Sequence, residues 1–265
     1  MRLCPIASGS SGNSIYVGSD NTHILIDCGI SGKKVAAGVN SLDLDMKDIS
    51  AILITHEHSD HIQGVGVLAR RYAIPIYGTE ETLNYIYNAP ETGKIDIDLL
   101  HPVKKDVDFM IGDLKIAPMH ISHDAVDPVA YRVYHEDAKC AVCTDLGIYD
   151  DYTVECLSGM DAVLLESNHD VNMLEVGPYP YYLKQRILSD RGHLSNDLCG
   201  SLLCRILHDK MKHIFLGHLS QENNYPDLAY ESVRTSVTIS DIPYNGGDFP
   251  IYVAKRHEPS LCVEF

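Results

Sequence analysis

Basic side chains are scarce in this chain of 265 residues, in which 21 lysines and arginines stand against 37 aspartates and glutamates, a formal net charge of −16. An excess of negative charge repels a polyanion at long range, so it counts against indiscriminate nucleic-acid binding. A local contact is still compatible with it, because carboxylates often gather around metal ions and on solvated faces. The charge lowers the expectation of a nucleic-acid partner without ruling one out.

Long apolar runs are also missing. No run approaches the roughly 20 residues that span a bilayer, and the start, M-R-L-C-P-I-A, lacks the apolar core of a secretion signal. The eight cysteines are scattered in a chain too large to need disulfide staples, which favours a reducing compartment. We interpret Cys140 and Cys143 as packed strand residues rather than a redox or zinc pair, because residues three apart on a strand face opposite ways. These absences predict a cytoplasmic protein without a membrane partner.

The rest of the composition is ordinary for a globular protein, with 45% hydrophobic and 22% charged residues. Strand-like runs alternate with helical patterns, and no repeat, low-complexity tract or linker interrupts them. The expected strands are Ser14–Val17, His23–Ile26, Ala51–Ile54, Ile74–Tyr77, Leu114–Pro118, Val129–Tyr134, Lys139–Cys143, Ala162–Leu165 and His213–Leu216, and the expected helices are His61–Tyr72 and Ser195–His208. The first two strands should pair about the turn G-S-D-N, and Ser195 or Asn196 should cap the second helix. We expect one α/β domain over residues 1–265, with two strand-rich halves.

The stretch T-H-E-H-S-D-H, Thr55 to His61, carries three imidazoles and two carboxylates directly after the apolar run A-I-L-I. His56 and His58 lie two apart beyond a strand end, so both rings can point to one side of the chain. Asp60 and His61 begin the next helix, where the helix dipole favours a carboxylate. A polar loop with histidines by chance is the alternative. Three of the 14 histidines within this one stretch favour a metal site.

Further ligand candidates also follow strand-like segments: His123 in M-H-I-S-H-D-A, Asp145 in C-T-D-L-G and His218 in F-L-G-H-L-S. His120 competes with His123, which we prefer because it lies beyond the strand, in the loop. Imidazoles and carboxylates without a thiolate suit Zn²⁺, Mn²⁺ or Fe²⁺ in a catalytic site better than a cysteine-rich structural zinc site. The set predicts metal-assisted chemistry.

The order H-x-H-x-D-H after a strand, a distant histidine, T-D-L-G and a late G-H resembles the metallo-β-lactamase fold, an α/β four-layer αββα sandwich, over almost the whole chain. Asp27 in I-D-C-G matches the early aspartate of that family. Within the superfamily, the motifs S-G-S-S-G-N, E-S-N-H-D, G-H-L-S-N and G-H-L-S-Q-E-N-N are most similar to the bacterial YycJ group, also called WalJ or VicX. That group is associated with 5′ to 3′ exonuclease action on DNA.

The resemblance implies two divalent transition-metal ions, Zn²⁺ or Mn²⁺, with Fe²⁺ as a third option. It assigns His56, His58 and His123 to one ion, and it assigns Asp60, His61 and His218 to the other. Asp145 would bridge the two ions. It further implies a metal-bridging hydroxide as nucleophile, because paired cations lower the pKa of a shared water. It also implies a catalytic role for Asp60. Asp27 would either orient a ligand or simply make a strand-end turn.

Residues outside the metal set bear on the substrate. In phosphodiesterases of this superfamily, such as the tRNA 3′-processing enzymes, a glutamate and a histidine assist the leaving group, and Glu166 and His193 occupy similar places in order. A histidine held by a carboxylate stays protonated more readily and can donate to a departing alkoxide. The alternative for His193 is a neighbour of the following helix cap. His169 is either another polar contact or a surface residue.

Two loops are expected to contact phosphate. Their residues are Ser8, Gly9, Ser10, Ser11, Gly12, Asn13, Ser220 and Asn223. Backbone N–H groups of the first loop suit an anion, although small residues also simply make turns. Asp145 and His218 lie too close in sequence for an inserted β-CASP domain, and no long basic arm is visible, so DNA is favoured over structured RNA as the partner.

The leading hypothesis is thus a dinuclear-metal phosphodiesterase, a 5′ to 3′ DNA exonuclease. The alternative is a metal-dependent hydrolase of a small thioester, lactone or cyclic phosphate, for which the acidic charge is no obstacle. A metal-binding regulator without turnover agrees poorly with the full ligand set. Glu166 with His193 separates the first two hypotheses, because thioester hydrolysis on this fold needs no such pair.

Overall fold

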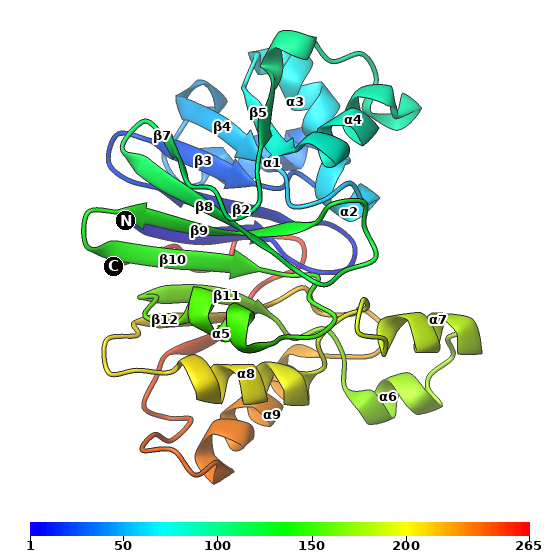
Figure 1. Cartoon of the computed structure of the whole chain (residues 1–265), viewed down its shortest axis with the longest axis vertical. Coiled ribbons are helices and arrows are strands. Elements are labelled where there is room, and N and C mark those ends of the chain that lie inside the picture. The colour runs from blue at the N-terminus through cyan, green and yellow to red at the C-terminus, as the bar shows by residue number, and fades with distance from the viewer. The chain divides into compact units, whose positions relative to one another are not determined.

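The computed structural model describes all residues from Met1 to Phe265, which form two compact units (Figure 1). The first unit consists of residues 1–120, 125–138 and 255–265, and the second of residues 121–124 and 139–254. None of the helices combines the length and the hydropathy that a membrane span requires.

The first unit holds a seven-stranded mixed sheet in the order β14-β1-β2-β3-β4-β5-β6. Its strands are β1 (Arg2–Ala7), β2 (Ser14–Gly18), β3 (His23–Ile26), β4 (Ile49–Leu53), β5 (Ile76–Thr79), β6 (Leu100–Val103) and β14 (Val263–Glu264). β2 and β3 pair antiparallel, which confirms the predicted hairpin, and β3 to β6 pair in parallel. β5 begins two residues later than predicted. Pro75 lacks the N–H that a strand ladder requires, which explains the later start.

Helices of the first unit are α1 (Gly32–Asn40), α2 (Ser59–Ile62), α3 (Val65–Tyr72) and α4 (Glu80–Asn88), with short 3-10 helices at Met46–Asp48, Pro90–Thr92 and Ile97–Leu99. The prediction of one helix over His61–Tyr72 was wrong, because the chain breaks between α2 and α3. Gly64 lies at the break and donates its N–H to the carbonyl of Cys28 at 2.7 Å. A Cβ atom at Gly64 would lie 2.4 Å from the carbonyl oxygen of Ile30, so the close approach requires glycine.

The first unit also contains an antiparallel set of three strands, β7 (Phe109–Ile111), β8 (Leu114–His120) and β9 (Val129–His135). The last two confirm the predicted strands and extend them at their carboxyl ends. The β7–β8 turn contains Gly112 at φ +54°, where a Cβ atom would lie 2.1 Å from Oγ1 of Thr22. The turns β2–β3 and β7–β8 therefore touch, which joins the two sets of strands within this unit.

The second unit is built on parallel strands: β10 (Ala138–Cys143), β11 (Ala162–Glu166), β12 (His213–Gly217) and β13 (Ile251–Val253). Its helices are α5 (Asp151–Leu157), α6 (Val171–Val176), α7 (Tyr181–Ile187), α8 (Asn196–Ile206) and α9 (Pro226–Ile239). Figure 1 shows α5, α8 and α9 together on one side of these strands. Ser195 is the N-cap of α8, and its side chain accepts from the N–H of Leu198. Of the two predicted caps, Ser195 or Asn196, the structure shows Ser195. Cys140 and Cys143 are buried and free, as expected for packed residues.

Candidate functional site

The carboxyl ends of three neighbouring strands in the second unit bring predicted site residues together. Because β10, β11 and β12 are parallel, their carboxyl ends meet at one edge, where Asp145, Glu166 and His218 lie. Oδ1 of Asp145 is 3.4 Å from Nε2 of His218, and Oε1 of Glu166 is 2.9 Å from Nδ1 of the same ring. All three side chains are buried. Two carboxylates and an imidazole out of water are costly unless paired or bound to a cation.

His193 completes this cluster. Its Nδ1 lies 2.9 Å from Oε1 of Glu166 and 3.5 Å from Oδ1 of Asp145, and its ring stacks on that of His218 at 5.3 Å between centroids. Ligand atoms of Asp145, Glu166, His193 and His218 all lie within 4.8 Å of one another. The side chain of His193 is 13% exposed, whereas the other three are buried. It is therefore the member of the cluster that a substrate can reach from solvent.

Glu166 is the buried anchor of the cluster. Its Oε1 lies within hydrogen-bond distance of both His193 and His218, and its Oε2 accepts from the backbone N–H groups of Leu146 and Leu194. Burial alone would raise the pKa of Glu166, but the charges and hydrogen bonds of His193 and His218 outweigh it and leave the pKa below its usual value. Glu166 is thus an anion that holds two imidazoles in place.

His123 lies beside the same cluster. Its Nε2 is 3.7 Å from Oδ1 of Asp145, and its Nδ1 is 3.1 Å from the carbonyl oxygen of Gly192. The competing His120 is half exposed and its Nδ1 lies 3.0 Å from Oδ2 of Asp106. The geometry agrees with the preference for His123. Its role as a metal ligand stays a prediction.

In the first unit, the loop that follows β4 gathers a second set of imidazoles. Nε2 of His56 is 3.1 Å from Nδ1 of His58, and the rings of His56 and His61 lie 4.1 Å apart between centroids. Nε2 of His61 is 3.5 Å from Oδ2 of Asp60. Ring nitrogens and carboxylate oxygens that face one another at such distances, without a thiolate, form a donor set that suits a divalent transition metal.

Asp27 orients this loop. Its Oδ2 accepts from Nδ1 of His61 at 2.7 Å and from Oγ1 of Thr55 at 2.8 Å, and its Oδ1 accepts from the N–H of Thr55. A carboxylate on Nδ1 fixes the tautomer of His61 and leaves Nε2 available as a ligand. Of the two alternatives for Asp27, the orienting contact is what the structure shows. Thr55 has a supporting role that the sequence did not single out.

Three of the predicted site residues adopt left-handed backbone conformations. The φ angles are +59° for Asp27, +60° for Asp145 and +55° for His218, each just beyond a buried strand. This region costs a residue with a Cβ atom roughly 1 to 2 kcal/mol. Such strain tends to persist at functional sites, where it directs a side chain. Four residues outside the predicted site, Asp43, Ala73, Asp106 and Glu136, share this conformation, so it accompanies the site chemistry and does not by itself identify the site.

The predicted phosphate loops are partly committed to internal contacts. Asn13 is buried, accepts from the N–H of Gly9 at 3.0 Å and places its Nδ2 at 3.2 Å from Nε2 of His61. Ser10 and Ser11 are exposed. Ser220 and Asn223 are buried, and the hydroxyl of Ser220 accepts from the N–H of Asn223. Phosphate binding by the two loops stays a prediction.

A set of buried amides has a supporting role that was not predicted, although its members stand in the quoted motifs E-S-N-H-D, G-H-L-S-N and G-H-L-S-Q-E-N-N. Nδ2 of Asn168 donates to the carbonyl oxygen of His218, and Nδ2 of Asn224 donates to Oδ1 of Asn196 and to the carbonyl of Ser167. These bonds join the loops after β11 and β12 to the start of α8. His169 is buried as well, and burial lowers its pKa to about 4, so the surface alternative for it was wrong.

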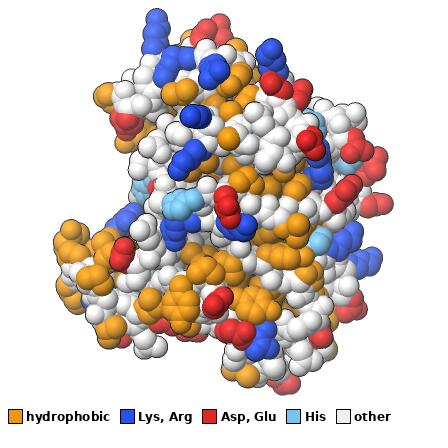
Figure 2. Space-filling model, turned by 180° about the vertical axis from the view of Figure 1, so that it is seen from behind, with side chains coloured by type: hydrophobic (Ala, Val, Ile, Leu, Met, Phe, Trp, Pro, Cys, Tyr) orange, Lys and Arg blue, Asp and Glu red, His pale blue; other side chains and the backbone are white.

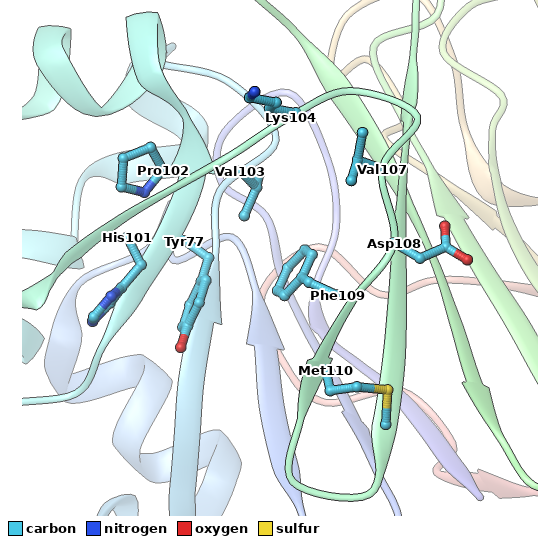
Figure 3. Close-up of a pocket in the computed structure, with 9 residues that line it drawn as sticks. All are labelled: Tyr77, His101, Pro102, Val103, Lys104, Val107, Asp108, Phe109 and Met110. Carbon is cyan, nitrogen blue, oxygen red and sulfur yellow. The ribbon is translucent and has the colours of Figure 1, made fainter.

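A pocket of about 510 Å³ lies elsewhere in the first unit. Figure 3 shows Tyr77 between His101 and Phe109, and the ring of Tyr77 stacks on both, at 4.9 Å and 5.4 Å between centroids. Its other lining residues are Pro102, Val103, Lys104, Val107, Asp108 and Met110. None of the predicted site residues lines it.

Comparison with known proteins agrees with the fold. A family model described as the β-lactamase superfamily domain matches residues 22–210. The metallo-β-lactamase-fold protein YhfI from Bacillus subtilis superposes with a TM-score of 0.71 at 16% identity, covering 98% of this chain and 99% of YhfI. Zn²⁺-bound PqqB from Methylobacterium extorquens has a TM-score of 0.72 at 14% identity and full coverage of both chains. These likenesses confirm the predicted fold class.

Two curated relatives are much closer in sequence. The chain is 42% identical over 247 residues to exodeoxyribonuclease WalJ of Streptococcus pneumoniae serotype 2 strain D39, covering 93% of this chain and 91% of WalJ. It is 42% identical over 233 residues to exodeoxyribonuclease YycJ of Bacillus anthracis, covering 88% of each. The chain therefore belongs to the β-lactamase superfamily as a metal-dependent hydrolase with the metallo-β-lactamase fold, in the group of WalJ and YycJ.

Proposed function

We propose that the chain is a dinuclear-metal phosphodiesterase that degrades DNA from the 5′ end. The observation that carries the proposal is the contact between Glu166 and His193, 2.9 Å apart within one cluster with Asp145 and His218. A carboxylate–histidine pair can protonate a departing alkoxide, which phosphodiester cleavage needs and thioester hydrolysis does not. The exodeoxyribonuclease names of WalJ and YycJ support the same substrate class.

The proposed ligands of the two divalent ions are His56, His58, His123, Asp60, His61, His218 and the bridging Asp145. The imidazoles and carboxylates of each unit fit such ions, because they are mostly buried and oriented by groups such as Asp27 and Glu166. When bound, the ions supply a water of lowered pKa and neutralise charge on the phosphoryl oxygens.

Side chains of the protein orient the catalytic groups and supply the proton for the leaving oxygen. Glu166 holds Nδ1 of His193, which leaves Nε2 of that ring to face the substrate and give a proton to the leaving oxygen. Asp27 and Thr55 keep His61 in one orientation. Phosphate contact by the loop of residues 8–13 is proposed through its exposed members Ser10 and Ser11, because the backbone N–H groups of its other residues already donate within the protein.

The test is a digestion of labelled strands. Purified protein is reconstituted with Mn²⁺ or Zn²⁺ and incubated with DNA labelled at either end, with RNA of the same sequence and with a thioester. We expect the 5′ label to be released as mononucleotide at once, while strands labelled at the 3′ end shorten progressively. Protein with Asp145→Ala, prepared in parallel, controls for contaminating nucleases. Thioester hydrolysis without DNA cleavage would favour the small-molecule hydrolase instead.

A further inference from the structure

Two adjacent tyrosines of α7 are exposed to solvent, in the segment between Glu166 and His193. Tyr181 is 76% and Tyr182 73% exposed. Figure 2 shows hydrophobic side chains gathered at the left, where α6 and α7 lie. Aromatic rings this exposed gain little from burial within the protein, and two of them together on one short helix form an apolar surface of the kind that contacts a ligand.

Basic side chains follow the two tyrosines. Lys184 and Arg186 lie on α7, and Arg191 lies just beyond it, in a chain whose formal charge is −16. Nζ of Lys184 donates to the carbonyl of Glu175, and Nη2 of Arg191 donates to the carbonyl of His123. Arg186 is paired with Asp124, whereas the contacts of Lys184 and Arg191 are to uncharged carbonyl groups and leave their charge in place. The surface of α7 thus combines two exposed aromatic rings with the positive charge of Lys184.

The carboxyl end of α7 is fastened to the candidate site. The N–H of His193 donates to the carbonyl of Ile187, the last residue of α7, at 3.0 Å. A Cβ atom on the intervening Gly192 would lie 2.2 Å from that same carbonyl oxygen. The turn between Ile187 and His193 is therefore tight. It connects α7 directly to the proposed proton donor.

We propose that α7 is a stacking platform for an unpaired strand, on which Tyr181 and Tyr182 contact bases while Lys184 contacts the backbone phosphate. The inference rests on the proposed function and deepens it. Base stacking on aromatic rings combined with cations is how proteins hold single strands without reading sequence. Self-association through α7 is less favourable, because a two-fold contact would bring the same cations of two copies together.

Binding and turnover of a short single-stranded oligonucleotide test the platform. In the doubly substituted Tyr181→Ala, Tyr182→Ala protein we expect KM to rise about 10- to 100-fold, with kcat on bis(p-nitrophenyl) phosphate unchanged. Tyr181→Phe with Tyr182→Phe should restore KM, because the phenyl ring still stacks. Tyr85→Ala with Tyr87→Ala is the matched control, because those tyrosines of α4 are 44% and 45% exposed beside two glutamates. Lys184→Ala should reduce the slope of log K against log salt by about 0.7.

Direct binding separates this inference from the proposed function. The Kd of a fluorescent oligonucleotide is measured on Mn²⁺-loaded protein carrying His193→Ala, with and without the two alanines on α7. Binding that the alanines weaken supports the platform, even where the wild type cleaves no DNA. Binding or KM unaffected by the alanines overturns it, as does an absence of binding. A dimer in sedimentation that the alanines dissociate would also overturn it, since α7 would then be a contact between copies.

Discussion

At the scale of single residues, the left-handed backbone of Asp145 offers a test of whether its conformation serves activity or stability. Its φ of +60° disfavours any residue with a Cβ atom. We expect metal-free protein with Asp145→Gly to be more stable than protein with Asp145→Ala by about 1 kcal/mol, while both are inactive. Urea unfolding measures the difference. Equal stability of the two variants would mean that the surrounding loop relaxes and stores no strain.

His193 is the proposed proton donor to the leaving group of a phosphodiester. We expect His193→Ala to lower turnover on DNA by about 10² to 10⁴ while the metal content stays intact. The loss on bis(p-nitrophenyl) phosphate should be much smaller, because its phenolate departs without a proton. Steady-state kinetics on both substrates and elemental analysis measure this. Equal losses on the two substrates would assign His193 to phosphate positioning instead.

Glu166 contacts two imidazoles rather than that of His193 alone. If Glu166 only supported the charge of His193, Glu166→Gln would give a milder form of the His193→Ala defect. Oε1 of Glu166, however, lies 2.9 Å from both His193 and His218, and His218 is a proposed ligand. We therefore expect Glu166→Gln to weaken metal binding as well. A loss of turnover confined to substrates with poor leaving groups should be seen with His193→Ala alone.

At the scale of elements, Asp113 joins the β7–β8 turn to the β2–β3 turn. Ser19 donates its hydroxyl to Asp113 at 2.8 Å, and the N–H of Asp113 donates to Oγ1 of Thr22. Hydrogen bonding with Thr22, then with Ser19 and Asn21, lowers the pKa of Asp113 to about 2. A carboxylate whose pKa is lower in the folded state than in the unfolded chain stabilises the fold above the unfolded pKa, and loses that effect as the pH falls through the folded value.

We expect Asp113→Asn to lower the free energy of unfolding at neutral pH by about 1 kcal/mol, after allowance for the partial exposure of this side chain. The difference from wild type should shrink as the pH falls from about 4 towards about 2. Urea unfolding across that range measures it. Asp108→Asn is the control, because Asp108 makes an exposed pair with Lys115 and should change stability by less than about 0.5 kcal/mol. A difference independent of pH would contradict the carboxylate as its source.

The elements differ in how well their sequences predict them. Runs such as Ala162–Leu165 are apolar throughout because parallel strands are buried on both faces, and β11 and β12 followed such predictions closely. The break at Gly64 depends on the carbonyl groups of Cys28 and Ile30, which are distant in sequence. A local helical pattern carries no information about such a contact. Likewise, nothing in the pattern of α7 indicates that its tyrosines face solvent.

At the scale of the whole molecule, the order of motifs predicted the family, while the supporting contacts came from the structure. His56, Asp145 and His218 were recognisable because each follows a strand and belongs to a spaced pattern. The bonding roles of Asn168, Asn196 and Asn224 were not, and Asn196 was considered only as a possible helix cap, because an asparagine acquires such partners only when folding brings them close. The sequence thus predicts the reactive groups better than the bonds that orient them.

The metal content of the protein reports on the complete set of proposed ligands. We expect two equivalents of Mn²⁺ or Zn²⁺ per chain after reconstitution, and we expect Asp145→Ala to weaken both together, because a bridging carboxylate belongs to both ions. Asp60→Ala, a proposed ligand of one ion, should leave about one equivalent. Metal that binds only the folded chain also raises Tm by mass action, so the rise on adding Mn²⁺ should be larger for wild type than for Asp145→Ala. Loss of a single ion in Asp145→Ala would make this residue a terminal ligand, and less than one equivalent in the wild type would contradict a dinuclear site.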